Sequence, residues 1–147
     1  MDLPPKSRNE ALAAIMRRMG VCEERGSGWE KVLLEVEIHQ LPPPLVEVTD
    51  HHTRAVLFAP RSLTRMDGAD RVRAVYQHAC LKWVMRQPMS NPTVRSRFGL
   101  ENQNAAMASR LIKEATTAGV IAPYDASVGS RSLRYVPWWA VSGHSSA

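Results

Sequence analysis

The sequence has little cysteine and no apolar run long enough to cross a membrane. Its two cysteines, Cys22 and Cys80, lie far apart along the chain. Such sparse cysteine excludes a disulfide-rich secreted domain and is typical of proteins kept in a reducing cytoplasm. No run of about 18 apolar residues is present, which excludes a membrane-spanning helix, and residues 1–6 lack the apolar core of a signal peptide. We therefore expect a cytoplasmic protein that does not bind a membrane.

The sequence also lacks the motifs of nucleotide hydrolysis, metal binding and covalent catalysis. It contains no G-x-x-x-x-G-K-[ST] loop, which is the pattern that surrounds nucleotide phosphates. His51 and His52 are neighbours whose side chains point apart, and no third ligand stands at a zinc-site spacing, so a solvated turn is favoured. His78 and Cys80 do not face each other on a helix, and Cys80 is interpreted as a small packing residue. We expect neither an enzyme nor a metal site.

The charge of the chain divides it into two halves of opposite sign. Residues 1–60 hold 7 basic and 9 acidic side chains, whereas residues 61–147 hold 12 basic and 5 acidic ones, and the net charge is +5. A basic surface is typical of modules that bind nucleic-acid phosphates. The alternative is that the surplus arginine only keeps the surface soluble. The length of 147 residues allows one domain or two very small ones.

The basic half has the hydrophobic period of three consecutive helices. The first starts near residue 72 and ends near Pro88. The second begins at Asn91, which caps it ahead of a proline suited to the first turn, and it ends at Gly99. The third covers residues 102–118, with Asn102 as its N-cap and Gly119 as its stop. The expected apolar positions are Val72, Val75, Tyr76, Ala79, Trp83 and Val84, then Val94 and Phe98, then Ala108, Leu111, Ile112 and Ala115.

A short β-hairpin is expected after the third helix. Residues 120–124 form an apolar run, residues 125–130 have a turn composition, and residues 131–136 alternate between polar and apolar as an edge strand does. Three helices with a tight turn between the last two, followed by a β-ribbon, is the layout of a winged helix-turn-helix. We assign residues 70–141 to such a module, which usually reads DNA. The aromatic ending at Trp138 and Trp139 is expected to pack the ribbon onto the helices, rather than to stack on bases.

Six segments of this half form a distinctive set, namely residues 76–80, 88–89, 97–104, 109–112, 118–121 and 135–140. Together they resemble the C-terminal tail of bacterial transcriptional regulators of the Schlafen/AlbA type, which are often labelled helicase-related or ATP-binding. The resemblance covers nearly the whole second half. It implies a winged helix used in transcriptional control.

The acidic half predicts two helices and a β-hairpin. The first helix is stopped by Gly20, after which Val21 and Cys22 are expected to pass through the core, and the second is ended by the prolines at 42–44. A hairpin of residues 45–49 and 54–58, turned at 50–53, follows, and residues 61–69 are expected to be a polar linker. The apolar faces of the two helices are Leu12, Ile15, Met16 and Met19, and Trp29, Val32, Leu33 and Val36.

Residues 8–9, 16–20, 24–28 and 41–44 are similar to the final part of the ATP-binding-like domain of the same regulators, a GHKL-type fold. We therefore assign residues 1–60 to a partial GHKL-like segment, and the whole chain to the α+β class, mainly helical. In that fold a glycine-rich loop that opens a helix can lie beside nucleotide phosphates. Gly26, Ser27 and Gly28 are thus candidate phosphate ligands, although a turn that allows close helix packing is the simpler interpretation.

The resemblance also bears on cofactors. The family segments that hold metal and adenine lie upstream of the matching part, so we expect no cofactor here and ATP only in longer family members. On this interpretation the chain is the C-terminal portion of a longer regulator, either a shortened gene product or an excised piece.

The expected function is that of a DNA-binding transcriptional regulator acting on double-stranded DNA, as a homo-oligomer. Asn102, Gln103 and Asn104 would enter the major groove, where Asn and Gln pair with adenine edges, and Met107 lies beside them. Phosphate contacts, which fix register without reading sequence, are expected from Arg95, Arg97, Arg110, Lys113, Arg131 and Arg134. The alternative is a protein–protein docking or dimerisation module of a larger ATP-binding regulator, with the third helix covered and the Met-rich first helix in the interface.

Overall fold

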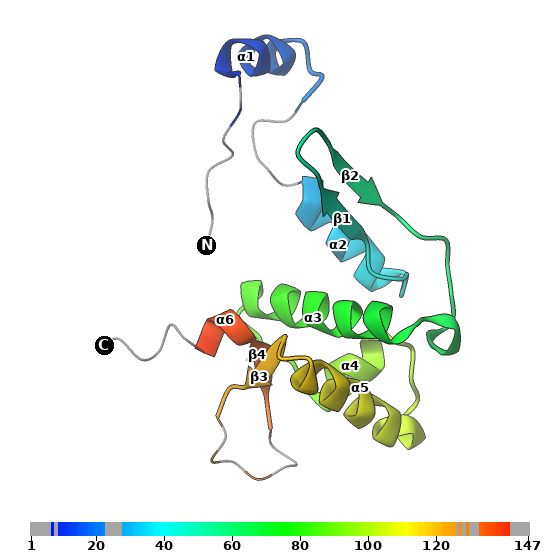
Figure 1. The fold of residues 1–147 in the computed structure, drawn as a ribbon. Helices are drawn as coiled ribbons and strands as arrows, with labels where there is room; N and C mark the ends of the chain where they lie inside the picture. The colour runs from blue at the N-terminus through cyan, green and yellow to red at the C-terminus, as the bar shows by residue number, and fades with distance from the viewer. Residues whose placement is uncertain are drawn as a thin grey trace.

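The computed structural model describes residues 7, 9–22, 28–125, 127, 129 and 133–141. Over these residues the fold is α+β and mainly helical, as predicted, with two separate two-stranded antiparallel sheets. Figure 1 shows α2 (Gly28–Ile38) and the first hairpin on one side of α3 (Gly68–Val84), and the remaining helices on the other, with α1 (Glu10–Arg18) set apart. No helix in the described part is long and apolar enough to span a bilayer.

The main hydrophobic core lies among α3, α4 (Asn91–Arg97) and α5 (Ala105–Thr117). The predicted face of α5 is confirmed, because its four apolar positions are all buried. The predicted face of α3 is partly wrong, since Val84 is 68% exposed while His78 is buried. Val84 lies nine residues after the buried Val75, and at about 100° per residue this spacing places it on the opposite side of the helix. The core members are Val75, Ala79, Met89, Val94, Ala108, Leu111, Ile112, Ala115 and Ile121.

The helix starts differ from those predicted. Ser90, not Asn91, occupies the N-cap position of α4, and its backbone N–H donates to the Thr93 hydroxyl at 3.0 Å. The Asn91 amide instead donates to Ala105 O and Ser109 Oγ, both at 2.9 Å, and so ties α4 to α5. Asn102 is not a helix cap, because a 3₁₀ turn, η2 (Asn102–Asn104), precedes α5.

The predicted second hairpin is present as a short ribbon of β3 (Ile121–Pro123) and β4 (Tyr135–Pro137), with Ala122 opposite Val136. Met89 adds a bridge at its edge: its N–H donates to Tyr135 O at 3.0 Å, and the Tyr135 N–H donates back at 2.9 Å. This bridge joins the α3–α4 connection to the ribbon. The chain then forms α6 (Trp138–Val141). Trp138 is 55% exposed, contrary to its expected packing role, whereas Trp139 contacts α3 through a hydrogen bond from its Nε1 to Tyr76 Oη.

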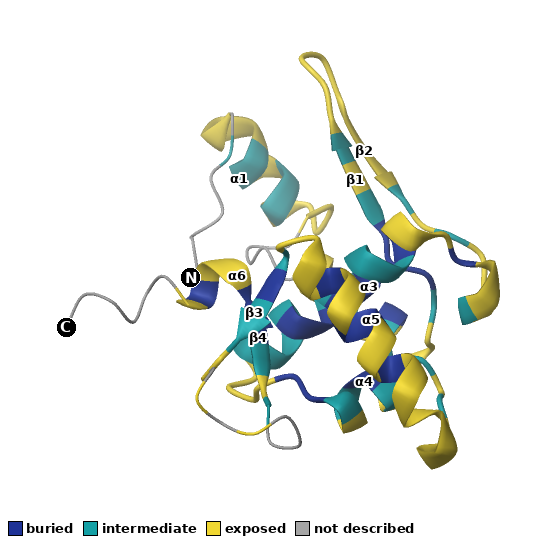
Figure 2. Cartoon of the chain, turned by 60° about the horizontal axis from the view of Figure 1, so that its bottom comes forward, coloured by how far each residue is buried: buried dark blue, intermediate teal, exposed yellow. Residues whose placement is uncertain are grey.

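Over its described residues, the first half has almost no core of its own. Its hairpin of β1 (Leu45–Val48) and β2 (Thr53–Val56) is confirmed, with β2 starting one residue earlier than expected. However, α1 buries none of its residues, and Val21 and Cys22 are exposed instead of passing through a core. Figure 2 shows α1 and the first hairpin with exposed and intermediate residues but no buried ones, whereas the buried residues gather around α3 and α5.

The segment predicted as a polar linker is folded against α3. It contains a short 3₁₀ helix, η1 (Leu63–Arg65), and Met66 is only 3% exposed. The Asp67 carboxylate accepts from the Asp70 N–H at 2.7 Å and thereby caps α3. The sequence signal for a linker was polarity, which does not distinguish solvated residues from capping ones.

The two cysteines should react at different rates with iodoacetamide. Cys22 is exposed, whereas Cys80 is half-buried on α3, where burial raises the pKa of its thiol against the opposing effect of hydrogen bonds from Tyr76 and Trp139. Because the thiolate is the reactive form, we expect fast labelling at Cys22 and slow labelling at Cys80 at pH 8, with the slow rate rising as the pH increases. Peptide mass spectrometry over time measures both rates, and equal rates would contradict the packing around Cys80.

Candidate nucleic-acid interface

Six of the predicted DNA-contacting residues lie along the exposed side of η2 and α5. Arg110 and Lys113 point away from the core, and Met107 lies at the side of the same surface. The described elements of the first half do not cover this surface, because α2 and the first hairpin lie on the other side of α3 (Figure 1). The structure thus brings together Asn102, Gln103, Asn104, Met107, Arg110 and Lys113 on one open face of the described chain.

Lys113 and Arg134 both line a groove between α5 and the ribbon. The groove has a volume of about 280 Å³, and the beginning of α4 closes its third side. None of the described residues that line it is acidic. Two cations in a groove with no acidic residue among its described lining form an electrostatic arrangement that suits a phosphate group. The other lining residues are Asn91, Pro92, Ser109, Ile112, Thr116, Pro123, Leu133 and Tyr135.

At the N-terminal end of the α5 face, exposed side chains are already engaged in hydrogen bonds. Asn102 Oδ1 accepts a hydrogen bond from the half-buried Arg95, so these two predicted contacts engage each other. Gln103 Nε2 donates to Glu101 Oε2 at 2.6 Å, which adds a negative charge to this end. Asn104 is exposed and its side chain makes no capping hydrogen bond. Of the three predicted base readers, Asn104 is therefore the best placed to contact a base.

Arg97 does not lie where a phosphate contact requires. It is 3% exposed, and its Nε forms an ion pair with Glu37 Oε2 at 2.7 Å. Its Nη2 donates to Leu41 O at 2.7 Å. Burial lowers the pKa of the Arg97 guanidinium, and the neighbouring Glu37 carboxylate opposes that shift. The assignment of Arg97 to DNA is therefore corrected: this arginine holds α4 against the end of α2.

The same carboxylate also binds His78, which completes a buried charged group that we call the Glu37 cluster (Glu37, His78 and Arg97). His78 Nδ1 hydrogen-bonds to Glu37 Oε1, and because a carboxylate only accepts, the ring nitrogen is the donor. The three side chains come from α2, α3 and α4. The cluster therefore joins the acidic first half to the basic helices that carry the candidate interface.

A second contact supports this junction at the turn between α4 and α5. Gln40, which follows α2 with a left-handed backbone (φ +52°), places its side chain over Gly99, and its Nε2 donates to Ser96 O at 3.3 Å. Gln77 on α3 donates to Pro44 O at 3.1 Å, and the three prolines at 42–44 are fully buried. The prolines thus do more than end a helix, because they form the packed link between the two halves.

The remaining predicted residues fall partly outside the described residues. Arg131, Gly26 and Ser27 lie there, so the expected phosphate loop is described only at Gly28, the first residue of α2. A Cβ atom on Gly28 would meet nothing within 4 Å, so close packing does not require glycine at this position. Glu30 stands in the first turn of α2, where its carboxylate would compete with a bound phosphate. Over the described residues, no group of three His, Cys, Asp or Glu side chains could hold a metal ion.

Sequence reasoning missed Glu37 and the groove residues Asn91 and Thr116. A signal for Asn91 was present, because Ser90 and Thr93 flank it at capping-box spacing and leave the Asn91 side chain free for other contacts. Glu37 carried no comparable signal, since its partners lie about 40 and 60 positions later in the chain.

Comparison with known proteins finds a similarity in the first half. Residues 1–57, which end within a residue of β2, match an HATPase-type family model described as "Putative ATP-dependent DNA helicase recG C-terminal". The match covers α1, α2 and the first hairpin and is less than half of the chain. This part is thus similar to an ATPase-related C-terminal region. No curated protein and no solved structure matches the chain.

Proposed function

We propose that residues 70–141 form a winged helix-turn-helix that binds double-stranded DNA, in a regulator of transcription that acts in the cytoplasm as a homo-oligomer. In this proposal α5 is the recognition helix and the β3–β4 ribbon is the wing. The observation that carries the proposal is the groove in which Lys113 and Arg134 converge, with no acidic residue among its described lining. A further support is the open face of α5, which none of the described elements covers.

The roles within this interface follow from exposure. Lys113, Arg110 and Arg134 contact phosphates, and these contacts fix the register of α5 on the duplex. Asn104 reads a base edge from the N-terminal end of α5. There its side-chain amide enters the major groove and pairs with an adenine. Arg95 and Asn102 change conformation together when DNA binds, because their side chains are hydrogen-bonded to each other. Arg97 takes no part in DNA contact.

Lys113→Ala and Arg134→Ala should each weaken binding to all duplex sequences by a similar factor. Each removes one phosphate contact, so the slope of log K against log salt should flatten by about one unit per substitution. Fluorescence anisotropy with a labelled random-sequence duplex at several salt concentrations measures the slope. Arg18→Ala serves as the control, because Arg18 is an exposed arginine on α1, outside the proposed interface. Unchanged binding and slope in both variants would contradict the proposal.

Asn104→Ala should alter sequence preference instead of overall affinity. A lost base contact costs about 1–3 kcal/mol at the site that it reads, while binding to random DNA should change little. Selection of bound duplexes from a random pool, sequenced for the wild type and the variant, makes the comparison. Identical selected sequences would exclude Asn104 as a base reader.

A second candidate function, a docking module of a larger ATP-binding regulator, is favoured by the exposed apolar side of α1. Leu12, Ile15 and Met19 are each more than half exposed, with Met19 at 72%. Contiguous apolar surface of this kind is typical of sites that another protein covers. This function predicts weak, salt-insensitive DNA binding, so the same salt titration separates the two candidates.

A further inference from the structure

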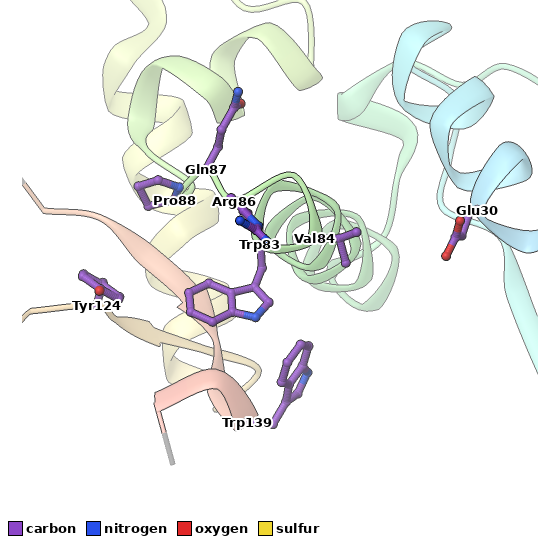
Figure 3. A pocket seen from close by; sticks show the side chains of 8 residues that line it. All are labelled: Glu30, Trp83, Val84, Arg86, Gln87, Pro88, Tyr124 and Trp139. Carbon is purple, nitrogen blue, oxygen red and sulfur yellow. The ribbon is translucent and has the colours of Figure 1, made fainter. Parts of the chain in front are cut away.

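A cleft of about 860 Å³ opens at the C-terminal end of α3, apart from the candidate DNA face. Trp83 and Pro88 line it from the end of α3 and the connection that follows, Tyr124 from the end of β3, and Trp139 from α6, while Glu30 faces it from α2 (Figure 3). Small-molecule sites are typically of roughly 300–1,000 Å³ and are lined by aromatic side chains with a few polar groups. The cleft has both properties.

The aromatic walls of the cleft are held in place by their own contacts. The rings of Trp83 and Tyr124 lie with centroids 6.5 Å apart and planes tilted by 49°. Trp139 Nε1 donates to Tyr76 Oη at 3.2 Å, which holds the indole ring beside α3. Aromatic rings that are already positioned bury much of a flat ligand at little entropic cost. The walls therefore suit a planar, aromatic ligand.

Arg86 supplies the positive charge at this cleft, and its backbone adopts a left-handed conformation that is uncommon for arginine. It follows α3 with φ +57°, in a turn closed by a hydrogen bond from the Gln87 N–H to Lys82 O at 2.8 Å. Glycine is the residue that this position favours, yet an arginine occupies it and its side chain lines the cleft. No ion pair links Arg86 to another residue of the described chain. A strained residue beside a cleft is a reason to look for a function of its side chain, and guanidinium groups bind carboxylates.

We propose that this cleft binds a flat aromatic monocarboxylate, with the ring against Trp83 and Trp139 and the carboxylate at Arg86. Glu30, which lies on the other side of the cleft in Figure 3, disfavours a second negative charge on the ligand. The ligand would also contact Tyr124, which follows β3 where the ribbon enters its connecting loop. Any effect of the ligand on DNA affinity rests on the proposed function, whereas its binding does not.

Isothermal titration calorimetry of the whole chain tests the site with three probes: naphthalene-2-carboxylate, its carboxamide, and naphthalene-2,6-dicarboxylate. We expect sub-millimolar affinity for the monocarboxylate and about tenfold weaker binding of the amide, which lacks the charge that Arg86 recognises. The dicarboxylate should also bind more weakly than the monocarboxylate. Arg86→Gly should weaken binding of the monocarboxylate about tenfold and leave the amide unchanged.

Arg86→Gly is an informative variant because glycine adopts the positive φ at this position without strain, so we expect the fold to be retained. Arg65→Gln is the charge-matched control, since Arg65 is an exposed arginine outside the cleft. Trp139→Leu should weaken all three probes, because it removes an aromatic wall. The proposal is overturned by absence of binding to the wild type, by equal affinity for acid and amide, or by full affinity in Arg86→Gly. The titration contains no DNA, so a failure of DNA binding leaves its result valid.

Discussion

Glu37→Ala is expected to lower the free energy of unfolding by about 3 kcal/mol, the scale at which a largely buried ion pair loses one partner. The substitution leaves Arg97, only 3% exposed, without its counter-ion, and it removes the hydrogen-bond partner of His78. Desolvation of an unpaired guanidinium is unfavourable, so the contact between α2 and α4 should open before the core melts. Thermal unfolding followed by circular dichroism should show a drop in midpoint of roughly 10 °C.

Two further variants test whether the loss of stability comes from the unpaired charge. Glu35→Ala is the matched control, because Glu35 lies on the same helix and, in the described part of the chain, pairs with the exposed ring of His39. It should change stability by less than about 0.5 kcal/mol. Glu37→Leu combined with Arg97→Met leaves no unpaired charge, so it should lose less stability than Glu37→Ala alone. Equal effects of Glu37→Ala and Glu35→Ala would show that the Glu37 cluster does not hold the two halves together.

Gly99→Ala should be the second most damaging single change, at about 2–3 kcal/mol. Part of this loss is the left-handed backbone at Gly99 (φ +61°), which costs a side-chain-bearing residue roughly 1–2 kcal/mol. The remainder is steric, because an added Cβ would lie 2.6 Å from Gln40 Oε1. Gln40 can move away only by giving up its hydrogen bond to Ser96 O. Urea unfolding gives the free-energy difference.

Gly119 provides the control for Gly99. Its φ is +72°, so alanine meets the same backbone cost there, but no atom lies within 4 Å of the added Cβ. Gly99→Ala should therefore be worse than Gly119→Ala by about 1 kcal/mol, and Gln40→Ala in the Gly99→Ala background should recover that difference. Equal losses at the two glycines would contradict the contact between Gln40 and the α4–α5 turn.

The elements that the sequence predicted well are those decided by neighbours along the chain. The four-residue apolar face of α5 is buried as its spacing required, and Gly20, Gly99 and Gly119 all adopt the positive φ expected where a helix stops. The helix starts were less well predicted, because Ser90 and Asn91 are both good caps and Asn102 begins a 3₁₀ turn. A choice between adjacent capping residues depends on what else each side chain can contact, as the Asn91 bonds to α5 show.

The residues of the candidate interface likewise differ in how far local sequence patterns could predict their roles. The sequence pattern did not distinguish Arg97 from Arg110, since both are arginines on or near the same expected helices. The structure separates them, because Arg97 pairs with a carboxylate 60 positions upstream whereas Arg110 stays in solvent. The convergence of Lys113 and Arg134 at one groove was likewise outside the reach of local patterns, because it depends on how the ribbon packs beside α5.

The amino-acid sequence alone determined the class of fold, the order of helices and hairpins, and the uneven charge, because these follow from composition and from spacing within a few residues. Only the tertiary structure decided which charged side chains face solvent and which are paired in the interior. The physical reason is that the burial of an ion pair is stable only when partners from distant segments meet, as Glu37, His78 and Arg97 do. The exposed apolar side of α1 has the same origin, since none of the described elements covers it.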